Sequence, residues 1–570
     1  MNACRLARPV RALVLLSVTM TACNRVAAPI GTPITSLADS GPGTLRDLLA
    51  TAQPGDTLRF QTPGTVNLAG PLSLSKDVTL LADGVTFDAG GKGRALEVAA
   101  GANVHVTGGT FTKGLGQPVV SASLGRQTTS RATWGGLVLN RGTLTLDGVT
   151  LTGGTANNGG AIYSSGTLTL RGVTMTGNTA TVPTPDIENE STGSGGAVAN
   201  TGVLTIESGT FRGNTAYYTG GVLRTGGASK ALLTIKDGLF ENNSCTYPNK
   251  ATSGPTGSDG CAGGALILGN DTTIEGGTFR GNTSTYVGGA IYISDGFKPV
   301  VSISGGTFEN NKTTGTVNNG GGAIFNQSKL LISGGIFKGN SSMSGGAINL
   351  YSGGALTLSG GTFEGNSASR YGGALQVNRS AALFEMTGGV LRGNTSGLNG
   401  GAINSDVTTT LTGGRIENNT AQDCGGGLSV WAPTGKLNTV TLGGTFVLQG
   451  NTAGKCGGGV NMGSEDPGGL TVNLDGAAMR GNSAAGTGGG FRVGAGTVLN
   501  LSGGSVTGNK ALGGAGGGIY NDGTLAVRSG SVNGNSATQG GGGVFNAAGA
   551  TFARTGGEVG GNAPDDIRGP

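Results

Sequence analysis

The chain has 570 residues, of which 119 are glycine and only 12% are Asp, Glu, Lys or Arg. This composition argues against a helical repeat protein, because charged residues are scarce and glycine is abundant. The formal net charge is +5, but residues 1–22 carry three arginines and no acid, so the remainder is nearly neutral and no nucleic-acid-binding surface is expected.

Residues 1–22 have the layout of an export signal. A basic segment with three arginines precedes a short apolar stretch, and Met20-Thr21-Ala22-Cys23 follows it. This tetrad resembles a bacterial lipobox, which implies cleavage before Cys23 and lipidation of that cysteine. An ordinary signal peptide cleaved nearby is the alternative. The expected location is therefore the bacterial cell envelope, lipid-anchored at the outer membrane or cell surface, or otherwise the secreted fraction.

Two short segments follow the signal. Residues 23–36 contain two prolines and are expected to form a tether. Residues 37–60 differ from everything after them: Thr44 can N-cap a helix that runs through Ala52, before Pro54-Gly55 ends it. This stretch resembles the N-terminal cap of secreted β-helix proteins, which covers the open edge of the first coil.

Residues 61–570 consist mainly of copies of one sequence repeat. The copy from Gly345 to Asn366 reads GGAINLYSGGALTLSGGTFEGN, and it contains three short runs of alternating apolar and polar residues between Gly-Gly pairs. Such alternation predicts strands with one buried face, and the glycines predict corners. One coil cannot bury its own apolar face, whereas stacked coils can. The sequence thus predicts about 17 coils of three strands and a rod of roughly 80 Å, at ~4.8 Å per coil.

The repeat carries a family resemblance. The pattern GGA-[I/L/V], as in Gly288–Ile291, alternates with F-x-x-N, as in Phe279–Asn282. It resembles the repeat of chlamydial polymorphic outer-membrane proteins and related surface proteins, over roughly residues 130–562. The resemblance implies an all-β fold, a right-handed parallel β-helix, but no particular activity. Members of that family end in an autotransporter β-barrel, whereas Pro570 follows the last repeat here, so a self-encoded barrel is not expected.

Two columns of polar residues recur at fixed places in the repeat. An asparagine at the corner is interpreted as an inward ladder, in which each side-chain amide bonds to the next coil, rather than as a glycan site or ligand contact. Its members include Asn214, Asn243, Asn282, Asn311, Asn340, Asn366 and Asn394. A charge of alternating sign stands nearby, and it is interpreted as a ladder that fixes coil register rather than as a charged ligand strip. Its members are Arg212, Glu241, Arg280, Glu309, Lys338, Glu364, Arg392 and Glu417.

Four cysteines remain once Cys4 and Cys23 are set aside. Cys424 and Cys456 hold equivalent places in consecutive repeats, and Cys245 and Cys261 bracket one long corner loop. In an exported chain this pattern predicts two disulfides, Cys245–Cys261 and Cys424–Cys456, with free thiols or a metal pair as the alternative.

The sequence contains no recognisable catalytic constellation. The only histidine, His105, lies in an expected strand, and the four glutamates of the charge ladder stand in separate coils rather than in a cluster. No catalytic residue, metal site or cofactor is predicted. Whether the chain is an enzyme stays open, and the sequence favours a protein without catalytic activity.

Corner insertions are the expected places for binding, because loops on a rigid scaffold often carry function. The candidates are Asp186, Glu188, Glu190, Tyr247 and Trp431. The expected function is a monomeric cell-envelope lipoprotein whose rod presents these loops to a glycan or a surface protein. A polysaccharide lyase or glycoside hydrolase is the first alternative, favoured if carboxylates gather in one groove. A purely structural envelope protein is the second.

Overall fold

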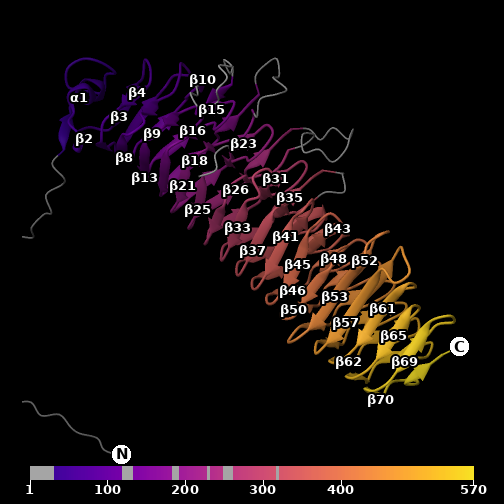
Figure 1. The fold of residues 1–570 in the computed structure, drawn as a ribbon. Helices are drawn as coiled ribbons and strands as arrows, with labels where there is room; N and C mark the ends of the chain where they lie inside the picture. Colours follow the sequence, from indigo (N-terminus) through magenta and orange to yellow (C-terminus); the bar gives the residue numbers. More distant parts are fainter. Residues whose placement is uncertain are drawn as a thin grey trace, which may run out of the picture.

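The protein is a single long rod in the computed structural model, which describes residues 31–118, 132–182, 192–226, 231–247, 261–315 and 320–569 (Figure 1). About 17 turns of parallel strands are stacked along its axis, as the sequence predicts. One short helix, α1 (Leu45–Thr51), lies at the N-terminal end, and the last strands lie at the opposite end. Among the described residues, no helix is long and apolar enough to cross a membrane.

Each regular coil has four strands rather than the expected three. In one coil these are β40 (Ile348–Leu350), β41 (Ala355–Leu358), β42 (Thr362–Glu364) and β43 (Ser367–Tyr371). We call the four resulting sheets the first, second, third and fourth sheet, in this order along the coil. Most strands of the fourth sheet have only two residues, such as Thr-Ala, which is too short for alternation to reveal it in the sequence.

The first sheet follows each Gly-Gly corner and later forms the floor of the candidate site. Its strands pair in parallel from coil to coil. The strands that matter below are β32 (Ile291–Ile293), β36 (Ile324–Asn326), β40, β44 (Leu375–Val377), β48 (Ile403–Ser405), β52 (Leu428–Ala432), β56 (Val460–Ser464) and β60 (Phe491–Val493).

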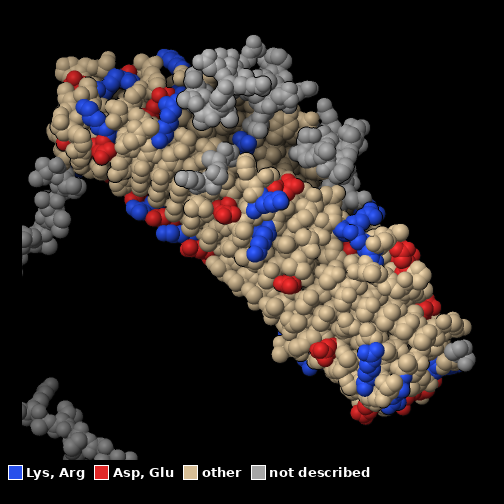
Figure 2. Space-filling view, viewed as in Figure 1, with Lys and Arg blue, Asp and Glu red and all other residues tan. Residues whose placement is uncertain are grey.

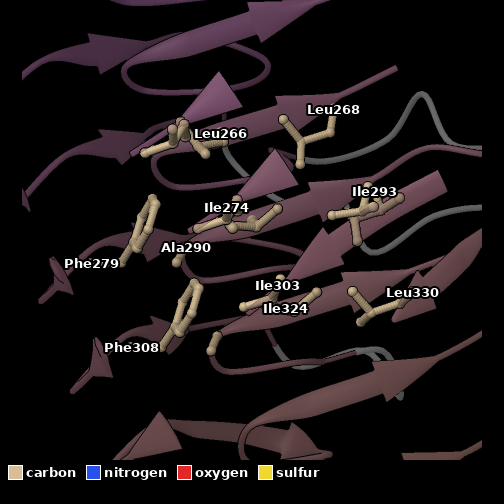
Figure 3. Close-up of a cluster of buried hydrophobic side chains, with 14 of the residues drawn as sticks. Leu266, Leu268, Ile274, Phe279, Ala290, Ile293, Ile303, Phe308, Ile324 and Leu330 are labelled. Atoms are coloured by element: carbon tan, nitrogen blue, oxygen red, sulfur yellow. The ribbon is translucent and has the colours of Figure 1, made fainter. Parts of the chain in front are cut away.

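The core is a continuous column of side chains inside the coils. Figure 3 shows apolar residues from neighbouring coils pointing into this interior, with the rings of Phe279 and Phe308 one above the other. In the third sheet, six buried phenylalanines stack with ring centroids 4.5–4.8 Å apart. They are Phe211, Phe240, Phe279, Phe308, Phe337 and Phe363. Offset aromatic pairs of this kind add to the burial of apolar area at every coil.

The Gly-Gly corners have two separate physical causes. Gly345 has φ 65°, a left-handed conformation that glycine adopts without a Cβ clash. A Cβ on the following residue, Gly346, would collide with the carbonyl oxygen of Gly373 in the next coil. The first glycine therefore permits the turn, and the second permits the coils to approach each other.

The N-terminal cap forms as the sequence predicts. Thr44 is the N-cap of α1, and its hydroxyl oxygen accepts a hydrogen bond from the backbone N–H of Asp47. Leu45 is buried against the first coils. The Arg46 guanidinium donates to the carbonyl oxygens of Gly70 and Pro71, which fastens the helix to the rod.

Candidate functional site

The corner asparagines are fully engaged inside the rod. The Asn243 side chain donates to Asn282 Oδ1 at 3.0 Å and to the carbonyl oxygen of Phe211 at 2.9 Å. The same pattern runs from Asn178 to Asn562, where the Asp566 carboxylate accepts the last bond. These side chains are buried, so they hold neighbouring coils together and offer nothing to a ligand.

The alternating charges lie in one column on the outside of the third sheet. Each is the register partner of an opposite charge in the next coil. Close ion pairs join Glu241 to Arg212 at 2.5 Å and to Arg280 at 2.6 Å, and Glu364 to Arg392 at 2.8 Å. Figure 2 shows few charged side chains on the visible face, and they are of both signs.

A second column of opposite charges was missed by the sequence analysis. On the second sheet, Arg171 contacts Asp147 at 3.4 Å and Glu207 at 2.7 Å, and Lys236 lies 3.9 Å from Glu207. The hydrogen bond from Arg171 holds the pKa of the Glu207 carboxyl below its usual range. Arg171, Glu207 and Lys236 each stand seven residues before a corner asparagine, so the repeat itself aligns them and could have revealed this column.

Both disulfides are present. Cys424 and Cys456 join consecutive coils with their Cα atoms 4.6 Å apart, and Cys245 and Cys261 close the corner loop with Cα atoms 5.6 Å apart. The backbone N–H of Cys424 also donates to Asn399 Oδ1 at 3.2 Å. The first of these bridges therefore lies beside Asn399, one of the residues of the groove described next.

The loop candidates from the sequence do not come together. Asp186, Glu188 and Glu190 lie outside the described residues, as does Cys23. Tyr247 packs against the rings of Tyr217 and Tyr218 next to the Cys245–Cys261 bridge. Trp431 lies in strand β52 rather than in a loop, and its side chain is 40% exposed.

Trp431 borders a polar groove of about 390 Å³ on the outside of the first sheet. Gln376, Asn404 and Ser429 form its floor, from the middle of strands β44, β48 and β52. Because strand side chains alternate, these residues point away from the core that their neighbours fill. They are nevertheless buried, since corner residues rise on both sides of them. A volume of this size is typical of small-molecule sites.

The floor belongs to a longer row of polar side chains. Asn349 precedes Gln376 in register, and Asn461 follows Ser429, so five successive coils place an amide or hydroxyl at the same position. The side-chain carbonyl oxygens of Asn349 and Gln376 are buried and have no hydrogen-bond partner among the described residues. A buried acceptor without a hydrogen bond costs about 1–3 kcal/mol of folding free energy. We therefore expect a ligand or a water molecule to bond to these two oxygens.

One wall of the groove contains Trp431 and three charged residues, Arg379, Asp406 and Glu465. Burial raises the pKa of the Asp406 carboxyl to about 6, against the opposing effects of a hydrogen bond from Asn404 and the nearby Arg379 charge. The pKa of Glu465 is instead lowered, chiefly by hydrogen bonds from Thr434. The Thr434 backbone N–H and hydroxyl donate to Glu465 Oε2 at 2.8 and 2.5 Å.

The opposite wall consists of Ser344, Tyr371 and Asn399. The groove thus combines uncharged donors and acceptors on the floor with aromatic and charged groups at the edges. Within the described residues, no group of three or more His, Cys, Asp and Glu side chains could hold a metal ion. The arrangement is suited to binding a polar molecule, and its two carboxyl groups have pKa values displaced in opposite directions.

A second, more open depression lies at the corners of the third sheet. Asn418, Arg480 and several corner glycines line it. Arg480 Nε donates to Gln449 Oε1 there, at 2.8 Å, and Gln449 donates in turn to Glu417. These polar groups already bond to each other as a continuation of the charge column, so this surface is a weaker candidate.

Comparison with known proteins gives one match. Residues 276–294 match the family model of the Chlamydia polymorphic membrane protein repeat. The matched segment contains Phe279 of the aromatic stack, Asn282 of the asparagine ladder and the Gly288-Gly289 corner, so the resemblance rests on the residues that pack the coils. No curated protein and no solved structure matches the chain.

The resemblance inferred from the sequence is confirmed for the repeat and for the fold. Together, the repeat and the solenoid suggest a bacterial surface protein. The residues of the groove lie outside the matched segment. The family model therefore says nothing about what the groove holds.

Proposed function

We propose that this chain is a bacterial envelope protein, anchored through a lipid on Cys23, that binds glycan in the groove of the first sheet. The groove carries the proposal: its floor contains a buried amide oxygen that has no hydrogen-bond partner among the described residues, and its edge contains the exposed Trp431 indole. Sugars suit this combination because their hydroxyl groups both donate and accept hydrogen bonds, while their C–H faces pack on aromatic rings.

The corner loops contribute by building the wall. Thr434, in the loop after β52, donates to Glu465 in the equivalent loop one coil further on, and Gly435 donates to Asp466 Oδ2 at 2.6 Å. Two stacked loops are thereby fixed to each other. A rigid rod that holds such a wall at a distance from the membrane fits an adhesin, because binding loops on a fixed scaffold lose little entropy on binding.

A glycan array tests this function directly. The chain from residue 23 onward, purified with Cys23→Ala, is applied to an array of bacterial, plant and animal glycans, and binding is repeated with Trp431→Ala. We expect selective binding that the Trp431→Ala variant loses. If no glycan on the array binds and an envelope protein binds in the same groove, the ligand is a protein rather than a glycan.

Lipid anchoring is tested separately in cells. The wild-type chain should incorporate labelled palmitate and sediment with the membrane fraction, whereas Cys23→Ala should do neither. Release of an unlabelled wild-type chain into the medium would instead support an ordinary signal peptide.

Polysaccharide cleavage is the second candidate, favoured by one observation. Asp406 and Glu465 line the same groove, and their pKa values are displaced in opposite directions, as the acid and base of a glycosidase require. Incubation with the array-positive polysaccharide distinguishes the two functions. Reducing-end or unsaturated products that disappear in Asp406→Asn but not in Gln449→Ala would establish cleavage, and binding without products would exclude it for that glycan.

A further inference from the structure

The polar row on the first sheet repeats at the spacing of the strands. Its five members are Asn349, Gln376, Asn404, Ser429 and Asn461, which are 1–8% exposed. Neighbouring strands of a sheet lie about 4.8 Å apart, and Gln376, Asn404 and Ser429 line the groove, so the groove offers one polar side chain at each of three such steps along the rod. A ligand that uses the whole row must repeat its own polar groups at a similar interval.

A chain of sugar rings meets this condition better than a peptide. One pyranose ring with its bridging oxygen advances a 1,4-linked chain by roughly 5 Å, because the five single bonds of about 1.5 Å from one anomeric carbon to the next do not run straight. An extended peptide repeats on one face only every two residues, or about 6.6 Å. A peptide would therefore fall out of step with the row within two or three coils.

The charged groups around the row are two carboxyl groups and one guanidinium. The floor has none, and the wall carries Arg379 beside Asp406 and Glu465, with the Glu465 carboxylate already bonded to Thr434. An anionic glycan would meet two carboxyl groups for one guanidinium. This excess of carboxyl groups disfavours an acidic glycan, whereas a neutral one meets no repulsion.

We infer that the groove binds a neutral, linear polysaccharide lying along the rod axis, with about one sugar ring per coil. This inference rests on the proposed glycan-binding function and adds the class and direction of the ligand. Gln376 Oε1, which has no hydrogen-bond partner among the described residues, accepts a sugar hydroxyl, and Trp431 packs against a ring at the wall.

Calorimetric titration with defined oligosaccharides tests the inference. The probes are cellohexaose, chitohexaose, mannohexaose and xylohexaose, followed by the two- to eight-ring series of each one that binds. We expect at least one hexasaccharide to bind, with affinity rising with each ring up to about three, the number of row positions that line the groove, and then levelling off.

Two floor variants locate the binding. Gln376→Ala and Asn404→Ala should each weaken the hexasaccharide about tenfold, the effect of one lost hydrogen bond. The matched control is Asn473→Ala, which removes an amide from the outside of the second sheet, where Asn500 donates to it at 2.9 Å. Thermal unfolding of all three variants establishes that each is folded.

The outcomes separate this inference from the proposed function. Failure of every neutral hexasaccharide to bind would overturn the inference, while array binding of branched or acidic glycans would leave the proposed function standing. Affinity that is already constant from two rings onward, or that is unaffected by both floor variants, would likewise overturn it. If no glycan binds on the array or in the titrations, both the inference and the proposed glycan-binding function are wrong.

Discussion

The indole ring of Trp431 lies over Gly463, its register partner in the next coil. A Cβ on Gly463 would collide with ring atoms Cε3 and Cζ3. The backbone of Gly463 does not have a positive φ, so alanine is allowed there apart from this contact. The glycine is thus a positioning residue, since its missing side chain lets the indole occupy the wall of the groove.

Gly463→Ala should therefore move the Trp431 ring without unfolding the coil. In a Trp134→Phe background, which leaves Trp431 as the only tryptophan of the chain, we expect a shifted fluorescence maximum and weaker binding of the array-positive glycan. The control is Gly560→Ala, where a Cβ meets little. Unchanged fluorescence in Gly463→Ala would show that the ring does not depend on this contact.

Asp406 should make the protein less stable as the pH rises. Its folded-state pKa of about 6 lies above the ordinary value of 3.8, because burial penalises the charged form. Between these values the folded state holds a proton that the unfolded state has lost, so stability is greatest below pH 4 and falls as the pH rises through 6. The shift corresponds to a penalty of the order of 3 kcal/mol at pH 7.

Asp406→Asn should remove this penalty and keep the hydrogen-bond acceptor for Asn404. The variant is expected to unfold at higher denaturant than wild type at pH 7 and at nearly the same denaturant at pH 4. Glu385→Gln, on the outside of the second sheet, controls for the loss of one negative charge. A stability gain that does not depend on pH would contradict the assignment to Asp406.

Breaking one rung of the asparagine ladder should destabilise the coils on both sides. Asn311 Oδ1 accepts bonds from the backbone N–H and side chain of Asn282, and its amide donates to Phe279 and Asn340. Asn311→Ala removes the acceptor of the buried Asn282 N–H, while the Asn282 amide keeps its bond to Phe240 and Asn340 Oδ1 keeps the backbone N–H of residue 311, so the cost is about 1–3 kcal/mol. Because each coil contacts only its neighbours, the effect should be local.

Amide hydrogen exchange measures this locality. The backbone N–H of Asn282 should exchange far faster in Asn311→Ala than in wild type, while amides near α1 keep their protection. Asn473→Ala, whose amide bonds at the surface, should change neither. If the backbone N–H of Asn282 keeps its full protection in Asn311→Ala, the Asn311 side chain does not stabilise the coil.

The coil packing could be predicted from the sequence because single residues determine it. Phe279, Asn282 and Gly288 each recur at the same place in repeat after repeat, and each has one physical role that its type reveals. The fourth sheet was not predicted, because a strand of two residues is too short to show an alternation of apolar and polar residues. The second charge column also holds a fixed place in the repeat, since Arg171 and Glu207 each precede a corner asparagine by seven residues, so the signal for it was present in the sequence.

The groove could not be predicted in the same way. Gln376 and Asn404 occupy outward strand positions, where polar residues are ordinary. The burial of these side chains depends on how far the corner loops around Trp431 and Glu465 project above the first sheet. It also depends on which coils carry those loops. Neither quantity is local in the sequence. The raised pKa of Asp406 follows from the same burial, so it too is invisible before the coils are in place.

The charge column should fix register more than it stabilises the rod. Glu241 lies between Arg212 and Arg280, and exposed pairs contribute only ~0.2–1 kcal/mol each. Glu241→Lys places three cations in adjacent coils and should cost about 1–2 kcal/mol at low salt, and clearly less at 0.5 M salt, where charges are screened. Glu385→Lys is the matched control, because its register partners Thr357 and Thr410 are uncharged. Denaturant unfolding at both salt concentrations checks this, and equal losses in the two variants would show that the alternation of sign has no energetic role.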